Sequence, residues 1–366
     1  MTGSIYIIHL KERRAMYEAK QGTLCIIQEM MCKITVSVCI SVFNTEDYLE
    51  RALDSVVVQG IEGIEIILVN NGSTDNSETI MWDYKSKHPD IDIKIFSQND
   101  RGLAQGRQTG INHATGEYIT FLDADDYLLP GAYKKILHYI QSKEADIYEF
   151  QTSREGRTIT SPYVGTKSTK AVLGEYLAGK YFPTMLWLRW YKKELFGSPV
   201  LPEFYVNNED NFAFPCLLYR ANTIEFIPEV LHVYSTDNEN GVMLSFENNK
   251  AANQKYYENR KKVLLSISHI NNYIGKENLE MHYHTEFIKF QVRTLLNFLF
   301  TSIEGISYEQ KMLNIIESTK FCNIPELENF IRKYCRFNCK MNLIIKAFGV
   351  RKAYSIYQGR RGESNL

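Results

Sequence analysis

Between Ile34 and Phe150, apolar runs alternate with amphipathic stretches in a regular order. The first run, ITVSVCISVF, is almost continuously apolar and β-branched, as expected of a strand that is buried on both faces. Residues 48–56 then repeat apolar side chains at helical spacing, and the later apolar runs are IEIILV, IDIKIF, GEYITFL and ADIYEF. This alternation predicts an α/β fold, a doubly wound unit with a mostly parallel sheet.

Acidic residues stand directly behind the run GEYITFL. Asp123, Asp125 and Asp126 follow an apolar strand whose packing gives no reason for charge at its end. Carboxylates so close together repel unless a cation joins them, and their hard oxygens suit Mg²⁺ or Mn²⁺ beside a phosphate. The alternative is a solvated turn whose acids favour the first turn of the helix that Pro130 opens. The residues alone leave these two interpretations equal.

Polar residues also end two other predicted strands. Asn44 follows the first apolar run, and Asn71 follows the second. In a doubly wound sheet, ligands bind beyond the carboxyl ends of the strands. We therefore expect one crevice to collect Asn44, Asn71 and the acids of residues 123–126.

The length of 366 residues exceeds one average domain, so we expect a core with a smaller appendage. Residues 33–245 are predicted to form the α/β domain. Residues 1–32 are predicted to be an N-terminal extension. Met30 and Met31 precede the first strand, which suggests that translation starts there and that residues 1–29 lie outside the fold. Residues 246–366 are predicted to be mainly helical, because apolar residues recur at spacings of three and four over Asn253–Ile267, Glu280–Phe300 and Tyr308–Glu317.

Charge and cysteine usage favour a cytoplasmic protein without a nucleic-acid partner. The formal net charge is −1, which gives no general attraction to nucleic acid. The 7 cysteines are an odd number and are scattered, as in proteins with reduced thiols. No run reaches the roughly 18 apolar residues of a membrane-spanning helix. The short apolar segment SIYIIHL is followed, not preceded, by basic residues, so it does not resemble a signal peptide.

The C-terminal segment Asn329–Gly362 is basic and amphipathic. It contains Lys and Arg without any acid, interleaved with apolar and aromatic residues. Such a mix suits a helix that lies on an anionic membrane, here the inner face of the cell membrane. A helix docked on the core with a solvated basic face is an equal alternative.

The chain resembles family 2 glycosyltransferases with the GT-A fold in four motifs: SVCISVFN, EIILVNNGSTDNS, RGLAQGRQTGINHATGEYITFLDADD and NNEDNF. They span residues 34–235 in the order and spacing of that family, and together they are specific. The resemblance implies an inverting enzyme that takes a sugar from a nucleoside diphosphate sugar, with UDP-sugars favoured, and a divalent cation, Mn²⁺ or Mg²⁺. Because bacterial members commonly build surface polysaccharides on lipid carriers, it also implies a saccharide or lipid-linked acceptor.

The resemblance assigns Ser41 and Phe43 to the pocket for the base, with Phe43 stacked on it. Asn71 stands where the family usually has an aspartate that accepts a hydrogen bond from uracil N3–H. An asparagine oxygen still accepts, although a neutral acceptor is weaker by roughly 1 kcal/mol, and the amide can instead donate. Arg107 matches an arginine that reaches the nucleotide, where it would hold either the diphosphate or the base-side aspartates. The alternatives are a core aromatic, a turn asparagine and a surface arginine.

In the Asp-Ala-Asp-Asp motif, the resemblance assigns Asp123 to the ribose or the metal and Asp125 to the metal. Asp126 is expected to cap the following helix. Glu209 and Asp210 match the family's Glu-Asp pair, so we expect Asp210 to be the catalytic base and Glu209 to position it or the acceptor. Adjacent acids before a helix are otherwise commonly charges that favour the helix dipole.

Aromatic residues lie between the Asp-Ala-Asp-Asp motif and the Glu-Asp pair and are candidates for acceptor contacts. Trp187, Trp190 and Tyr191 lie where the family places acceptor contacts, but core packing is an equal alternative. His232 is a candidate metal ligand, although a packed histidine is favoured. Ser235 stands where the family often has an arginine that contacts the diphosphate.

The sequence leaves two rival functions. Aspartate-led phosphohydrolases also carry an Asp-x-Asp motif, but theirs follows the first strand, whereas Asp123 follows the fourth. A catalytically inactive nucleotide-sugar-binding or scaffold protein is the second rival, and Asn71 is the feature that favours it. The presence of both Asp125 and Asp210 favours an enzyme.

Overall fold

The computed structural model describes residues 35–100, 102–159, 161–181, 183–206, 208–238, 257–258 and 261–300. They fall into two compact units, residues 35–173 with 183–238 and residues 174–181 with 257–300. The N-terminal extension predicted for residues 1–32, the helix predicted over Tyr308–Glu317 and the basic segment Asn329–Gly362 lie outside the described residues.

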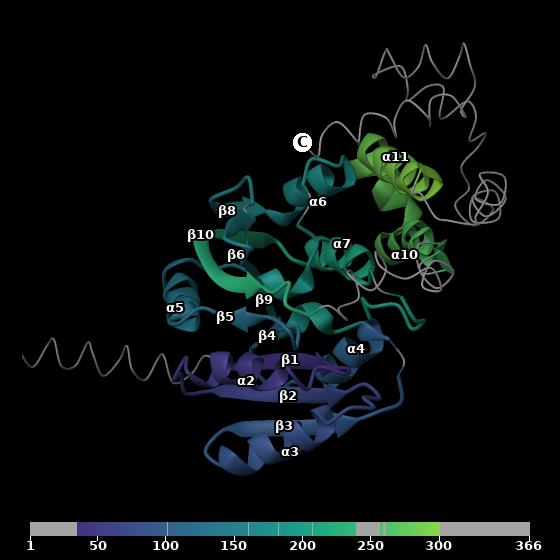
Figure 1. The fold of residues 1–366 in the computed structure, drawn as a ribbon. Helices are drawn as coiled ribbons and strands as arrows, with labels where there is room; N and C mark the ends of the chain where they lie inside the picture. Colours follow the sequence, from purple (N-terminus) through teal and green to yellow (C-terminus); the bar gives the residue numbers. More distant parts are fainter. Residues whose placement is uncertain are drawn as a thin grey trace, which may run out of the picture. The chain divides into compact units, whose positions relative to one another are not determined.

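Strand β1 (Val36–Val42) is central to the first unit and is buried along almost its whole length. It pairs in parallel with β2 (Ile64–Asn70) on one side and with β4 (Tyr118–Phe121) on the other. Strand β3 (Asp92–Ser97) continues the parallel order beyond β2. Figure 1 shows these strands side by side with their connecting helices around them. The prediction of an α/β fold is therefore confirmed, and the strands in this half of the sheet are all parallel.

Helices α2 (Leu49–Val57), α3 (Ser77–Lys87) and α4 (Leu103–His113) connect these strands. Two glycines let α4 pack closely against the sheet. A Cβ on Gly110 would lie 3.0 Å from the Cβ of Cys39, and a Cβ on Gly106 would overlap Ser41 Oγ. The close packing carries the polar side chains of α4 to the ends of β1 and β2.

The other half of the sheet mixes directions. Strands β6 (Ile147–Arg154) and β10 (Thr223–Tyr234) are parallel to each other. Strand β9 (Arg189–Lys192) lies antiparallel between β4 and β6 and joins the halves. The order is β3-β2-β1-β4-β9-β6-β10-β5. The smaller strands are β5 (Tyr127–Leu128), β7 (Arg157–Ile159) and β8 (Gly165–Ser168).

The remaining helical elements of the first unit are α5 (Ala132–Ser142), η1 (Leu186–Leu188), η2 (Lys193–Phe196) and α7 (Asp210–Arg220), and α6 (Thr169–Leu177) runs across the boundary between the units. The second unit contains α10 (Leu265–Ile274) and α11 (Lys276–Phe300). The helix predicted over Glu280–Phe300 is confirmed within α11, whose backbone is kinked at Tyr283 (φ −136°, ψ 19°). None of the described helices combines the length and apolarity needed to cross a membrane.

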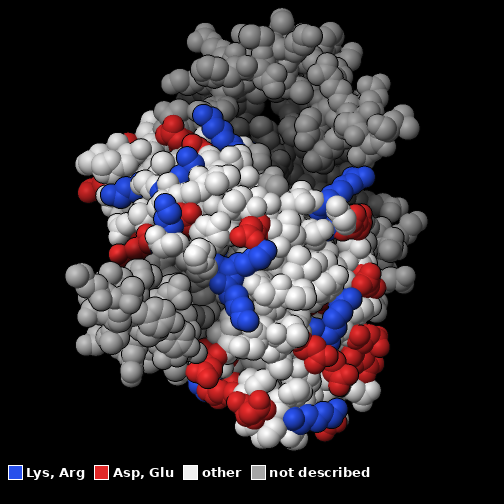
Figure 2. All heavy atoms as spheres, turned by 90° about the vertical axis from the view of Figure 1, so that its left-hand side faces the viewer, with Lys and Arg blue, Asp and Glu red and all other residues white. Residues whose placement is uncertain are grey.

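Charged side chains of both signs lie on one face of the protein (Figure 2). Figure 2 shows Lys, Arg, Asp and Glu side chains spread over the face that it draws, and neither sign covers that face. The face therefore presents no broad field of one sign.

Candidate active site

Polar residues gather at the carboxyl ends of β1, β2 and β4, as the strand pattern predicted. Asn44 adopts a φ of 51° after β1, and its Oδ1 accepts the Thr74 N–H at 2.8 Å. This contact holds the loops that follow β1 and β2 together. Ser41 and Asn71 both face Gly106 of α4, because a Cβ added there would overlap Ser41 Oγ and lie 3.7 Å from Asn71 Cγ. Glycine at residue 106 is therefore what lets α4 reach both strand ends.

Two side chains at these strand ends differ sharply in exposure. Phe43 is 46% exposed although it is large and apolar, whereas Asn71 is 3% exposed. Asn71 Oδ1 accepts a hydrogen bond from Gln98 Nε2 at 2.7 Å. The hydrogen bond engages the oxygen end of the buried Asn71 amide, and the exposed ring of Phe43 leaves a face that a planar base could cover.

Arg107 is the charged centre of the site. Its Nη2 donates to Asp123 Oδ1 at 2.7 Å, and its Nη1 donates to Asp210 Oδ1 at 3.2 Å and to Glu209 Oε1. Only 3% of the Arg107 side chain is exposed. Burial lowers the pKa of Arg107, but the charges of Glu209, Asp123 and Asp210 outweigh burial and raise the pKa above its usual value. The guanidinium therefore remains charged and joins the two acidic motifs.

Glu209 and Asp210 meet this charge at the start of α7. The Glu209 side chain is 1% exposed, and its Oε2 has no hydrogen-bond partner among the described residues. The Asp210 side chain is 20% exposed, and its Oδ1 also accepts the Leu186 N–H at 3.1 Å. Asp210 is thus the acid of this pair that solvent reaches.

The pKa values of both carboxyls are raised. Burial raises the pKa of Glu209 to about 8, against the opposing charge of Arg107. Burial also raises the pKa of Asp210, while Arg107 and the Leu186 N–H lower it. A carboxylate with a raised pKa is a stronger proton acceptor.

The acids of residues 123–126 are held from two sides. Asp125 Oδ2 accepts Asn238 Nδ2 at 2.9 Å, and the Asp125 carbonyl accepts Arg51 Nη2 at 2.7 Å. Burial, and then the charge of Asp123, raise the pKa of Asp125. The motif is therefore fixed in place while its carboxylates still repel.

Asp126 does not cap the following helix, and that expectation is wrong. Helix α5 begins at Ala132 after Gly131 and has no side-chain cap. Asp126 is buried instead, and its Oδ1 accepts the Ser235 N–H at 2.8 Å. Burial, and then the charges of Asp123 and Asp125, raise the pKa of Asp126 to about 9.

These carboxylates fit a divalent cation. No group of three or more His, Cys, Asp or Glu side chains within the described ranges is arranged to hold a metal by itself. Mg²⁺ sites at phosphates commonly use one or two carboxylates and complete the shell with phosphate oxygens and water. Asp126 Oδ2 is buried without a hydrogen-bond partner and lies 3.5 Å from His232 Nε2. Burial, and then crowded negative charge, raise the pKa values of Asp125 and Asp126. Both observations agree with a site that accepts positive charge.

Arg51 and Asn238 are site residues that the sequence did not reveal. Arg51 Nη2 also donates to Ser235 Oγ at 3.0 Å. The family often has an arginine in place of Ser235, and here the guanidinium of Arg51, on α2, lies beside that serine. In the sequence, Arg51 lies on the polar face of an amphipathic helix. The serine at residue 235, where the family often has arginine, was the one sequence signal that an arginine elsewhere in the chain takes its place.

The aromatic residues between the motifs are buried. Trp187, Trp190 and Tyr191 all belong to the core, which favours the packing alternative over acceptor contacts. His232 stacks on Trp187 with ring centroids 4.3 Å apart, and burial lowers the pKa of His232 to about 3. His232 is therefore a neutral, packed histidine in this structure.

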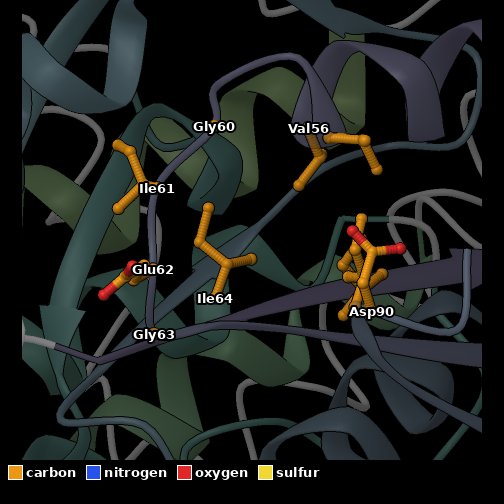
Figure 3. A pocket seen from close by; sticks show the side chains of 10 residues that line it. Val56, Gly60, Ile61, Glu62, Gly63, Ile64 and Asp90 are labelled. Carbon is orange, nitrogen blue, oxygen red and sulfur yellow. The ribbon is translucent and has the colours of Figure 1, made fainter.

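A separate hollow lies away from these residues. It has a volume of about 300 Å³ and lies at the amino end of β2, where Val56, Gly60, Ile64 and Asp90 contribute to its lining (Figure 3). The acids follow the carboxyl end of β4, which is parallel to β1 and β2. The hollow is thus at the opposite edge of the sheet from the candidate site.

The fold is that of a GT-A-type α/β domain, as its likeness to the solved structure of S. aureus TarS 1–349 shows. Residues 37–196 match the family model for glycosyl transferase family 2, so the chain contains a domain of that family. The confirmed resemblance covers the motifs from β1 to β9.

Relatives and solved structures agree with this assignment. The chain is 30% identical over 209 residues to the uncharacterized glycosyltransferase EpsJ of Bacillus subtilis, a match that covers 54% of this chain and 60% of EpsJ. It is 36% identical over 113 residues to the minor teichoic acid biosynthesis protein GgaB of the same organism, covering 30% of this chain and 12% of GgaB. The matches thus span less than two thirds of these relatives. The crystal structure of S. aureus TarS 1–349 in complex with UDP-GlcNAc has a TM-score of 0.61 and 18% identity, covering 90% of this chain and 92% of that one.

Proposed function

We propose that this chain is an inverting glycosyltransferase that moves a sugar from a nucleoside diphosphate sugar, most readily a UDP-sugar, to a saccharide or lipid-linked saccharide. The observation that carries the proposal is the set of contacts around Arg107. They bring Asp123 together with Glu209 and Asp210 in a chain with a family 2 domain. One site then combines acids suited to a donor diphosphate with an acid suited to an acceptor.

We assign the donor base to the pocket beside Phe43. Its exposed ring supports stacking, and Ser41 and Asn71 beside Gly106 support polar contacts to the base edge. Arg107 holds Asp123 in place from one side, which supports Asp123 as a partner of the ribose or the cation. The solved complex of TarS with UDP-GlcNAc supports a uridine donor.

We assign a divalent cation, Mn²⁺ or Mg²⁺, to Asp123 and Asp125. One oxygen of each carboxylate is engaged, by Arg107 and by Asn238 respectively, and we assign the second oxygen of each to the cation. When bound, the cation supplies positive charge for the departing diphosphate. Arg51 and Asn238 then act as positioning residues that keep the Asp125 carboxylate turned toward the diphosphate.

We assign Asp210 as the base. Its Oδ1 is held by Leu186 N–H and Arg107, so Oδ2 is the atom that takes the proton from the acceptor hydroxyl. The acceptor oxygen bonds to the anomeric carbon as the bond from that carbon to the diphosphate oxygen breaks. A single displacement of this kind inverts the anomeric centre. Glu209 holds Arg107 from the buried side and thereby keeps the ion pairs of Asp210 in place.

The acceptor is proposed to belong to a bacterial surface polymer. The name of the relative GgaB, a minor teichoic acid biosynthesis protein, supports this class of acceptor. We also propose that the basic segment Asn329–Gly362 binds an anionic membrane on its cytoplasmic face. In cosedimentation with anionic vesicles, the full chain should bind more than a chain ending at Pro325, and high salt should remove the difference. Equal binding of the two chains would exclude this attachment.

The test of the proposed function is release of nucleoside diphosphate from a panel of UDP-, GDP- and CDP-sugars, with and without Mn²⁺. The proposal expects Mn²⁺-dependent release that Asp125→Asn abolishes and that Asp90→Asn, an exposed acid at the far edge of the sheet, leaves unchanged. Binding of a nucleotide sugar without any release, in the presence of the candidate acceptors, would favour the inactive nucleotide-sugar-binding protein instead.

A further inference from the structure

A chain of three polar side chains ends at the proposed base pocket. Thr109 Oγ1 donates to Gln98 Oε1 at 2.7 Å, and Gln98 Nε2 donates to Asn71 Oδ1 at 2.7 Å. The oxygen of the Asn71 amide is therefore engaged by Gln98. The nitrogen Nδ2 is the end of the amide that is left to meet a base.

The backbones under this chain are fixed. Asn71 N–H donates to the carbonyl of Val42 at 2.8 Å, and Gln98 N–H donates to the carbonyl of Asn70 at 2.9 Å. Asn71 is 3% exposed, and Gln98 and Thr109 are half-buried. Because the backbones are held, the amide groups are the parts of this chain that can turn.

The direction of the chain decides which base edge Asn71 complements. Uracil carries a hydrogen on N3 and needs an acceptor there, whereas cytosine N3 is an acceptor and needs a donor. In the observed direction, Asn71 Nδ2 complements cytosine and opposes uracil. If both amides turn, Asn71 Nδ2 donates to Gln98 Oε1 and Gln98 Nε2 donates to Thr109 Oγ1, because a hydroxyl both donates and accepts. Asn71 Oδ1 then complements uracil.

We infer that Gln98 determines which end of the Asn71 amide meets the base, and that the choice between uridine and cytidine donors depends on Gln98 as much as on Asn71. The inference rests on the proposed function, because it takes the pocket beside Phe43 as the base site. An aspartate at residue 71 would offer acceptors only. The amides of Asn71 and Gln98 can present either a donor or an acceptor, so the pocket can take either cytosine or uracil. We expect the unmodified chain to bind UDP and CDP with affinities within about tenfold of each other, since one neutral hydrogen bond separates them.

Two substitutions of Gln98 should shift this choice in opposite directions. A carboxylate accepts only, so Gln98→Glu takes hydrogen bonds from Thr109 and from Asn71 Nδ2 and turns Asn71 Oδ1 to the base. An ammonium donates only, so Gln98→Lys holds Asn71 Oδ1 in its observed direction. Measured by calorimetry on the full chain with Mn²⁺, the ratio of UDP affinity to CDP affinity should rise about tenfold in Gln98→Glu and fall in Gln98→Lys.

Gln108→Glu is the matched control. Gln108 lies on the same helix and donates to Asn112 Oδ1 at 2.9 Å on the surface, so the substitution makes the same change of charge outside the chain of hydrogen bonds. The ratio of UDP to CDP affinity should stay at the unmodified value. An equal shift in Gln108→Glu and Gln98→Glu would assign the effect to charge and overturn the inference.

The outcomes separate this inference from the proposed function. If the unmodified chain binds neither UDP nor CDP, both the function and the inference fail. If it binds them and both Gln98 variants keep the same ratio, the function stands and the inference alone is overturned. Opposite shifts of the ratio of UDP affinity to CDP affinity in the two variants support the inference. A merely structural role of Gln98 would weaken the binding of UDP and CDP together.

Discussion

Arg107 Nη2 donates to Asp123 Oδ1 at 2.7 Å and so ties helix α4 to the carboxyl end of β4. The same guanidinium reaches Asp210 Oδ1, which is 103 residues away in the sequence. The motif behind β4 and the motif at the start of α7 therefore share one buried charge. This shared charge makes the stability of the site depend on a single side chain.

Replacing Arg107 with Met should destabilise the protein by about 3–5 kcal/mol at pH 7, because the carboxylates would lose a buried counter-charge. The loss should shrink as the pH falls from 9 to 5, since Glu209, with a pKa of about 8, and Asp210, whose pKa is also raised, gain protons over this range. Urea unfolding across this pH range measures the effect. Arg157→Met, an exposed arginine on β7, should change the free energy of unfolding by less than about 0.5 kcal/mol. Equal losses in the two variants would contradict a central role for Arg107.

Asp125→Asn should remove the gain in UDP affinity that Mn²⁺ confers. It should not lower the free energy of unfolding, because burial, and then the charge of Asp123, already raise the pKa of Asp125 and disfavour its charged form. Calorimetry of UDP with and without Mn²⁺ measures the first effect, and urea unfolding measures the second. An undiminished Mn²⁺-dependent gain would remove Asp125 from the proposed cation site, and Asp90→Asn provides the matched control.

Arg51→Met should weaken Mn²⁺-dependent UDP binding by about 10- to 100-fold, the usual effect of losing a side chain that positions a metal ligand. Arg51 Nη2 holds the carbonyl of Asp125, and Nη1 donates to Asp237 Oδ2 at 3.0 Å. Arg51→Lys keeps the charge but cannot make both contacts, so an intermediate loss is expected. If the binding of UDP measured without Mn²⁺ is weakened by the same factor, Arg51 acts on the nucleotide directly and not through Asp125.

Glu65 should make stability depend on pH below 5. Burial raises its pKa, but hydrogen bonds from Lys94, Ser37 and Thr115 outweigh burial and lower the pKa to about 2. A carboxyl with a lowered folded-state pKa stabilises the fold above its unfolded pKa, and this stability is lost as the pH falls toward 2. The free energy of unfolding should therefore fall more steeply between pH 5 and 2 in the unmodified chain than in Glu65→Gln. Parallel curves in urea unfolding would contradict the assignment.

The periodicity of the sequence sufficed to predict the parallel half of the sheet. Apolar runs such as β1 and β2 are buried on both faces, and burial of that kind leaves a strong pattern. Strand β9 escaped prediction because its sequence RWYK is short and does not alternate. Its antiparallel place between β4 and β6 depends on pairing between residues far apart in the sequence.

The candidate site was predictable where a residue follows a strand. Asn71 and Asp123 were placed correctly at strand ends because parallel strands carry their carboxyl ends to one edge. Arg51 and Asp126 were not, because their partners in residues 235–237 come from the far end of the domain. The contact between Gln98 and Asn71 likewise follows from the register of β2 and β3, which one sequence does not contain.

The most direct test of the account compares Asp210→Asn with the unmodified chain at saturating donor and acceptor. The transfer rate should fall by about 10² to 10⁴, the usual contribution of a positioned base, while the donor dissociation constant stays nearly unchanged. In the unmodified chain, the rate should also fall as the pH drops through the raised pKa of Asp210, because the base must be ionised. A normal rate at saturation with greatly weakened donor binding would show that Asp210 binds substrate and is not the base.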